Sequence, residues 1–106
     1  MRKQYLKYRA KNKEKVLLTC MRAYAKKGGF APPDITEEGL RELLQTHSGI
    51  CDLEGCNKPA RDLDHDHVTG RVRGRLCHQH NKALGQFSDS ITELSAAIRY
   101  LEKGRK

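Results

Sequence analysis

The chain has 106 residues and a mass of 12.1 kDa, with 37% hydrophobic residues, 32% charged residues and a formal net charge of +8. This length excludes a second full-sized core, and with two Phe, four Tyr and no Trp we expect a metal, disulfides or oligomerisation to add stability. The sequence contains no run of about 18 apolar residues and no apolar secretory signal, which predicts a soluble, cytosolic protein without a membrane partner.

Positive charge is concentrated at the amino end. Residues 1–30 carry ten Lys or Arg against one acidic residue, a net charge of +9, whereas residues 31–106 carry eleven against twelve, a net charge of −1. Clustered cations bind polyanions by releasing counterions, which favours nucleic acid over a membrane surface. The plainer alternative is a solvated helix that only aids solubility. We therefore divide the chain into a basic helical DNA-binding arm, residues 1–30, and a body, residues 31–106.

The arm is predicted to be helical because residues 3–27 lack Gly and Pro and are rich in good helix formers. Gly28 and Gly29 end the predicted helix. Its apolar side is assigned to Leu6, Ala10, Leu17, Met21 and Tyr24. The basic residues expected to contact DNA are Lys7, Arg9, Lys11, Lys13 and Lys15.

A second helix is predicted to begin after Thr36, whose hydroxyl can cap the first amides, and to end near His47 to Gly49. Leu40, Leu43, Leu44 and His47 share one face at helical spacing, which is typical of a short helix packed on a core. We interpret His47 as structural.

Residues 50–76 lose the helical period and predict a metal-bearing loop followed by a β-hairpin with its turn near Thr69 and Gly70. In the first strand, Leu63, His65 and His67 alternate with Asp62, Asp64 and Asp66. In the second strand, Arg71, Arg73 and Arg75 alternate with Val72, Gly74 and Leu76, which predicts three guanidiniums on one side.

Two helices are predicted after the hairpin. The first begins near Asn81. The second opens with a capping box, Ser90 to Glu93, and places apolar residues at helical spacing, which predicts a packing helix. Those apolar residues are Ile91, Leu94, Ala97, Ile98 and Leu101.

Four residues have the spacing of a zinc site: Cys51-x4-Cys56 and Cys77-x2-His80. Two ligand pairs on separate loops that close around one ion indicate a tetrahedral, structural Zn²⁺. His78 lies close enough in sequence to be the alternative fourth ligand. Cys20 stands apart and is interpreted as a small buried apolar residue.

Between the two zinc pairs lies the dense run Asp64-His65-Asp66-His67, preceded by Asp62. Carboxylates this close repel one another, and a hard divalent cation such as Mg²⁺ would relieve the repulsion. A polar hairpin on the surface is the structural alternative.

These motifs, together with the run from Gly70 to Cys77 and His80-Asn81-x3-Gly85, resemble the recombination endonuclease VII family of HNH, or ββα-metal (His-Me finger), nucleases. The likeness covers about residues 36–101. It implies an α+β fold in which helices flank a small zinc-stabilised ββα-metal core. The chain departs from the family pattern at His80 in place of a Cys, in the wider first zinc pair, and at Leu84 in place of an acidic residue.

By position, the resemblance implies that Asp64 and Asn81 bind a catalytic Mg²⁺ or Mn²⁺ and that His65 is the general base for hydrolysis of DNA phosphodiester bonds. His67 and Asp66 are auxiliary candidates. The phosphate-contact candidates are Arg71, Arg73 and Arg75, with Arg73 first.

The alternative function is a zinc-stabilised DNA-binding module without catalysis. A catalytic zinc is disfavoured because four protein ligands saturate a tetrahedral ion. The DNA substrate stays open between junctions, nicks and duplex. Paired cuts at a junction would need a homodimer, which the small core favours but no heptad repeat indicates. By analogy to the family, a phage origin would place the protein in the host cytoplasm.

Overall fold

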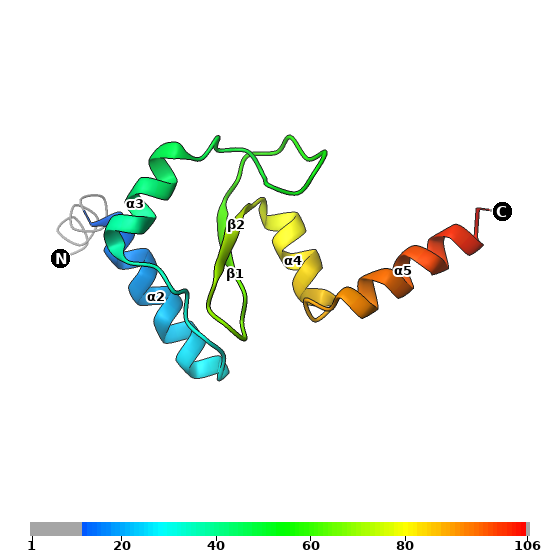
Figure 1. Ribbon diagram of the computed structural model, residues 1–106, viewed down its shortest axis with the longest axis horizontal. Helices are drawn as coiled ribbons and strands as arrows, with labels where there is room; N and C mark the ends of the chain where they lie inside the picture. Colours follow the sequence, from blue (N-terminus) through cyan, green and yellow to red (C-terminus); the bar gives the residue numbers. More distant parts are fainter. Residues whose placement is uncertain (1–11, 106) are drawn as a thin grey trace, which may run out of the picture. The chain divides into compact units, whose positions relative to one another are not determined.

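The computed structural model describes residues 12–105, and this part of the chain forms an α+β fold (Figure 1). It contains four helices and one two-stranded antiparallel sheet, in which β1 pairs with β2. The elements are α2 (Lys13–Gly28), α3 (Glu37–Thr46), β1 (Asp62–His65), β2 (Val72–Leu76), α4 (His78–Gln86) and α5 (Ile91–Lys103). The α+β class predicted from the sequence is confirmed. Residues 1–11, which include the predicted contacts Lys7, Arg9 and Lys11, lie outside the described part.

The chain divides into two compact units. Within the described residues, the first unit contains residues 12–49 and 63–74, and the second contains residues 50–62 and 75–105. The hairpin contributes residues to both units.

Helices α2 and α3 form the core of the first unit together with Leu63 of β1. Leu18 and Leu40 are fully buried there. Partly buried apolar residues pack around them: Met21, Ile35, Leu43, Leu44 and Val72. Helix α2 ends as predicted, with Gly29 in the left-handed region at φ 74°, where an L side chain is disfavoured.

The predicted apolar side of α2 is confirmed at Met21, which packs on the core, and wrong at Leu17 and Tyr24, while Leu6 and Ala10 lie outside the described residues. Leu18 and Ala25 are buried, whereas Leu17 is exposed and Tyr24 is 69% exposed. The polar sequence of this helix offers few apolar residues, so its burial is decided by the residues of α3 and β1 that pack against it.

A short extended segment links α2 to α3 and runs along the hairpin turn in the first unit. The Ala31 amide donates to the His67 carbonyl at 2.9 Å, and the Asp34 amide donates to the Gly70 carbonyl at 2.7 Å. Gly70 has φ 82°, and a Cβ there would lie 2.5 Å from the Pro32 carbonyl oxygen. Glycine is therefore required for this close approach.

Helix α3 begins as the sequence predicts. The Thr36 hydroxyl accepts a hydrogen bond from the Gly39 amide at 3.0 Å. His47 caps the carboxyl end of the helix, and its Nδ1 accepts a hydrogen bond from the Gly49 amide at 2.9 Å. Its structural interpretation agrees with this contact.

The second unit has a small core in which most of the residues are cysteines. Cys51, Leu76 and Cys77 are buried, with Cys56 and Leu84 packed against them. Helix α4 begins at His78, three residues before the predicted start at Asn81. The predicted start was wrong because Cys77, one of the four predicted zinc ligands, is also the N-cap of the helix. His80 therefore lies within the first turn of α4.

Helix α5 begins at the predicted cap, where the Ser90 hydroxyl accepts from the Glu93 amide at 3.1 Å. Its predicted packing role is wrong for the described chain. No residue of α5 is buried, and Ile91 is 83% exposed. None of the helices in residues 12–105 is long and apolar enough to cross a membrane.

Candidate metal centre and hairpin site

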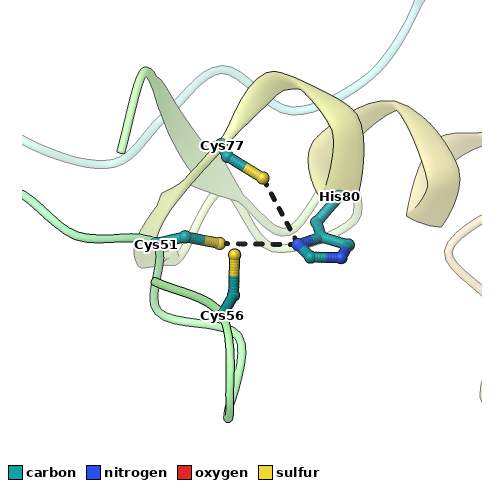
Figure 2. A group of neighbouring side chains, drawn as sticks. All are labelled: Cys51, Cys56, Cys77 and His80. Carbon is teal, nitrogen blue, oxygen red and sulfur yellow. Dashed lines mark hydrogen bonds between the residues drawn. The ribbon is translucent and has the colours of Figure 1, made fainter. Parts of the chain in front are cut away.

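The second unit brings together the four side chains that the sequence predicts as zinc ligands (Figure 2). Cys51 and Cys56 come from the loop before β1, and Cys77 and His80 come from the start of α4. Their ligand atoms all lie within 4.8 Å of one another. The Cys51 amide bonds to the Lys58 carbonyl at 2.9 Å, and a turn from Leu53 to Cys56 returns the second thiol to the cluster.

The spacing of these atoms fits a tetrahedral zinc ion. With Zn–S of about 2.3 Å and Zn–N of about 2.0–2.1 Å, a tetrahedral site separates a sulfur from a nitrogen by about 3.6 Å. Nδ1 of His80 lies 3.8 Å from Sγ of Cys51 and 3.3 Å from Sγ of Cys77 (Figure 2). Three thiols and an imidazole therefore form a donor set that can hold zinc with no open position for water.

The thiols of the cluster differ in acidity. Burial alone would raise the pKa of Cys51, but hydrogen bonds from the backbone of Cys77 and Leu53 and from the side chain of His80 lower it to about 6. A hydrogen bond from the Lys58 backbone lowers the pKa of Cys56, yet burial and the neighbouring thiols raise it overall. Because zinc binds thiolates, Cys51 is the thiol best prepared to bind.

His80, and not His78, is the imidazole that faces the thiols. Nδ1 of His78 lies 3.4 Å from Oδ2 of Asp62 instead. Cys20 lies on α2, where it is exposed. Its interpretation as a buried apolar residue is therefore wrong, because the buried side of α2 contains Leu18 and Ala25.

In the first unit, the Asp64 carboxylate is paired with Arg73 on the neighbouring strand. Nε of Arg73 donates to Oδ2 at 2.8 Å, and a terminal nitrogen donates to Oδ1 at 3.0 Å. Arg73 also donates to the His65 carbonyl at 3.4 Å. The two-point ion pair fixes the orientation of the Asp64 side chain.

The His65 ring is buried, with 5% of the residue exposed. Its Nε2 lies 3.0 Å from the carbonyl oxygen of Ala31, in the segment that follows α2. Because a carbonyl only accepts hydrogen bonds, Nε2 must be the protonated nitrogen. Nδ1 of the neutral ring is then the nitrogen that can accept a proton.

Asn81 lies in the second unit, where its side chain contacts that of Asp62. Nδ2 of Asn81 donates to Oδ2 of Asp62 at 3.1 Å. In the sequence, Asp62 is one of three closely spaced carboxylates and lies on the same side of the first strand as Asp64, but neither signal indicates a contact with Asn81. Of the two residues implied to bind the catalytic ion, Asp64 therefore belongs to the first unit and Asn81 to the second.

The auxiliary candidates on the hairpin turn have structural contacts. The Asp66 carboxylate accepts from the amides of Thr69 and Val68, at 3.0 Å and 2.7 Å, and these bonds lower its pKa. The His67 ring stacks on Phe30, with ring centroids 4.0 Å apart and planes at 12°. Sequence analysis missed Phe30, which no local motif marks.

The basic residues predicted to contact DNA differ in exposure and in their contacts within the protein. Arg71 is exposed and precedes β2, so it does not extend the strand as predicted. In the second unit, the Arg75 side chain donates to the Ala60 carbonyl at 3.4 Å. Lys13 and Lys15 are exposed on the first turn of α2.

Comparison with known proteins places these features in a family. The model of a family described as recombination endonuclease VII matches residues 26–103. The Gene 59 protein of Mycobacterium phage D29 is 46% identical over 73 residues, which cover 65% of this chain and 44% of that protein. The Gene 59 protein of Mycobacterium phage L5 is 45% identical over 71 residues, which cover 63% and 43%. No solved structure matches at a significant level.

The chain spans less than half the length of these curated relatives. The family match, in contrast, extends over most of the chain, from the end of α2 to the end of α5. It includes the four-residue metal cluster and the whole hairpin. The chain belongs to the recombination endonuclease VII family.

Proposed function

We propose that the protein is a DNA endonuclease that hydrolyses phosphodiester bonds in a metal-dependent, HNH-type site on the β-hairpin. Family membership supports the reaction class. The observation that carries the proposal is the state of His65, a buried imidazole whose Nε2 is held by the Ala31 carbonyl. A base needs one nitrogen free to accept a proton, and this contact selects Nδ1 for that role.

The residues implied to bind Mg²⁺ or Mn²⁺ have suitable donor chemistry. Asp64 offers a carboxylate, and Asn81 offers an amide whose nitrogen is committed to Asp62, so its oxygen is the atom left for a cation. Hard divalent cations prefer such oxygen ligands. When bound, the ion would stabilise negative charge on the phosphate and on the leaving oxygen.

His65 performs the proton transfer in the proposed reaction. Its Nδ1 takes a proton from the water that attacks phosphorus, while Ala31 keeps the ring in place and stabilises the imidazolium that forms. The bond from phosphorus to the 3′ oxygen breaks, so one fragment keeps a 5′ phosphate and the other ends in a 3′ hydroxyl. The zinc cluster has no open position, so its role is to hold the loop before β1 against α4.

Phosphate contacts come from basic residues in this proposal. Arg71 and the lysines of α2 are exposed, and Arg73 lies beside Asp64 where a phosphate would approach the ion. Side chains of this kind contribute affinity without reading sequence. Affinity for DNA should therefore fall steeply with salt.

We also propose that two copies pair through α5. This helix exposes Ile91, Ile98 and Leu101, which recur at the spacing of one helical face. Exposed apolar faces of this kind mark interaction sites, and paired cuts in DNA need two active sites.

The function is tested with zinc-loaded protein and supercoiled plasmid, with and without Mg²⁺ or Mn²⁺. We expect metal-dependent nicking by the wild type and a loss of roughly 10²- to 10⁴-fold in the His65→Ala variant. The matched control is His47→Ala, which removes an imidazole at the end of α3 and should leave cleavage unchanged. Full activity of folded His65→Ala would contradict the assignment, and DNA binding without cleavage by the wild type would favour the non-catalytic DNA-binding module.

A further inference from the structure

The first unit carries a row of aromatic rings that the proposed reaction does not use. Tyr24 meets Phe30 edge to face, with centroids 5.5 Å apart and planes at 69°. Phe30 stacks on His67, and the His67 ring lies 5.0 Å from that of His65. The row thus leads from α2 to the histidine assigned as the general base.

The row ends in an exposed ring. Tyr24 is 69% exposed although it contacts Phe30, whereas Phe30 is half-buried and His65 is buried. A tyrosine that served only to cover the end of α2 would bury most of its surface. Most of the Tyr24 surface is therefore accessible to a flat ligand.

The inner part of the row is held firmly. Phe30 follows the left-handed Gly29, and its amide bonds to the Ala25 carbonyl at 3.0 Å. Its ring packs over Gly28, where a Cβ would lie 2.5 Å from the ring. The hydrogen bond from the Ala31 amide to the His67 carbonyl also holds the backbone next to Phe30 against that of His67. The two rings that Tyr24 adjoins are therefore preorganised.

Cations lie on the same side of α2 as Tyr24: Lys27 is its neighbour, and Lys13 is farther along the helix. Helical spacing places Lys27 one turn after Tyr24, and Lys13 lies three turns before it on the same side of α2. All three side chains are exposed. Aromatic rings between cations are the combination with which proteins bind single-stranded nucleic acid, because bases stack on the rings while phosphates meet the cations.

We propose that Tyr24 is a stacking site for an unpaired base of the DNA strand, and that Phe30 and His67 connect this site to the hairpin. The ligand class is a nucleobase that is free of its complement, since a base inside a duplex has no accessible face. This inference rests on the proposed function for the identity of the polymer. It adds a binding contact that selects DNA with a displaced or unpaired nucleotide.

The test measures stacking without cleavage. Zinc-loaded protein, without added Mg²⁺ or Mn²⁺, is titrated into DNA that carries 2-aminopurine either as a single unpaired bulge or at the same position in a duplex. Stacking on an aromatic ring quenches this fluorescent base. We expect the wild type and Tyr24→Phe to quench the bulged base and to bind bulged DNA more tightly than duplex.

Tyr24→Ala should lose the quenching, and its affinity for bulged DNA should fall by roughly 5- to 150-fold with little change for duplex. The control variant is Tyr100→Ala, which removes an equally exposed tyrosine from α5 and should bind like the wild type. Zinc content and melting temperature establish that the variants are folded.

Three results would overturn the proposal: retained quenching in Tyr24→Ala, an equal loss of affinity for bulged and duplex DNA, or a loss in Tyr24→Phe as large as that in Tyr24→Ala. Plasmid cleavage with Mg²⁺ is assayed separately. A protein that quenches but does not cut refutes the endonuclease function and keeps the stacking site, whereas one that cuts but does not quench does the reverse.

Discussion

At the scale of single residues, Arg73 and the proposed divalent cation would compete for the Asp64 carboxylate. Both of its oxygens accept hydrogen bonds from Arg73, and the proposed reaction assigns the same oxygens to a divalent cation. A guanidinium beside a carboxylate supplies positive charge that a metal ion would otherwise supply. In the proposed site, Arg73 would therefore weaken the binding of the cation, in addition to any contact with phosphate.

We predict that Arg73→Gln binds Mn²⁺ more tightly than the wild type, because the competing cation is gone. A hydrogen-bonded charge pair of this kind contributes on the order of 1 kcal/mol, which corresponds to roughly a fivefold change in the dissociation constant. The measurement is titration of zinc-loaded protein with Mn²⁺, followed by the electron paramagnetic resonance signal of the free ion.

Arg71→Gln is the matched control for Arg73→Gln, since it removes an exposed arginine from the same hairpin. Its affinity for Mn²⁺ should change less than that of Arg73→Gln. Equal affinities in the wild type and Arg73→Gln would show that Arg73 does not compete for Asp64.

At the scale of elements, the second unit depends on its metal cluster for a core. Three of the five residues that make up this core are the cysteines of the cluster, and the other two are Leu76 and Leu84. Zinc binding in such a unit is part of the folding free energy and amounts to about 10 kcal/mol in small metal domains. That amount equals or exceeds the total stability of most domains of this size.

We predict that Cys56→Ser loses stoichiometric zinc and the cooperative thermal transition of the second unit. The matched control is Cys20→Ser, which changes an exposed cysteine on α2 and should keep one zinc per chain and the wild-type melting curve. Zinc is measured by atomic absorption and folding by circular dichroism. A Cys56→Ser protein that melts like the wild type would mean that the cluster does not stabilise this unit.

The elements also differ in how well sequence predicts them. Thr36 and Ser90 cap their helices as expected, because a capping bond joins residues three apart and depends only on local sequence. The four cysteine and histidine ligands were likewise found by spacing alone. The buried side of α2 and the exposure of α5 were missed, because burial depends on what packs against a helix.

In the hairpin site, too, local features could be predicted from sequence and contacts between distant residues could not. The alternation in the sequence placed Leu63, His65 and His67 on one side; the first two are buried in β1, whereas His67, beyond the end of the strand, is exposed. The bond from His65 to Ala31 joins residues 34 positions apart and has no sequence signature. The stacking of His67 on Phe30 likewise becomes visible only when the chain after α2 lies along the hairpin.

At the scale of the whole molecule, α5 leaves an apolar face on the surface of a small protein. Ile91, Ile98 and Leu101 are each more than half exposed. The two ends of the helix also differ in charge: Glu93 lies in the first turn, whereas Lys103 in the last turn and Arg105 just beyond the helix outnumber Glu102. Two antiparallel copies of α5 would pair these apolar residues and bring the acidic end of each helix to the basic end of the other.

We predict that the wild type forms a weak dimer of twice 12.1 kDa and that Ile98→Glu is a monomer, because the substitution puts a charge into the centre of the paired face. A single short helix from each copy makes an interface at the small end of the known range, so the dimer should dissociate at micromolar concentrations. Sedimentation equilibrium over a wide concentration range measures this. Thr92→Glu, which adds the same charge on a polar side of α5, should still dimerise. A wild type that stays monomeric at the highest concentration would leave each hairpin site to make single nicks.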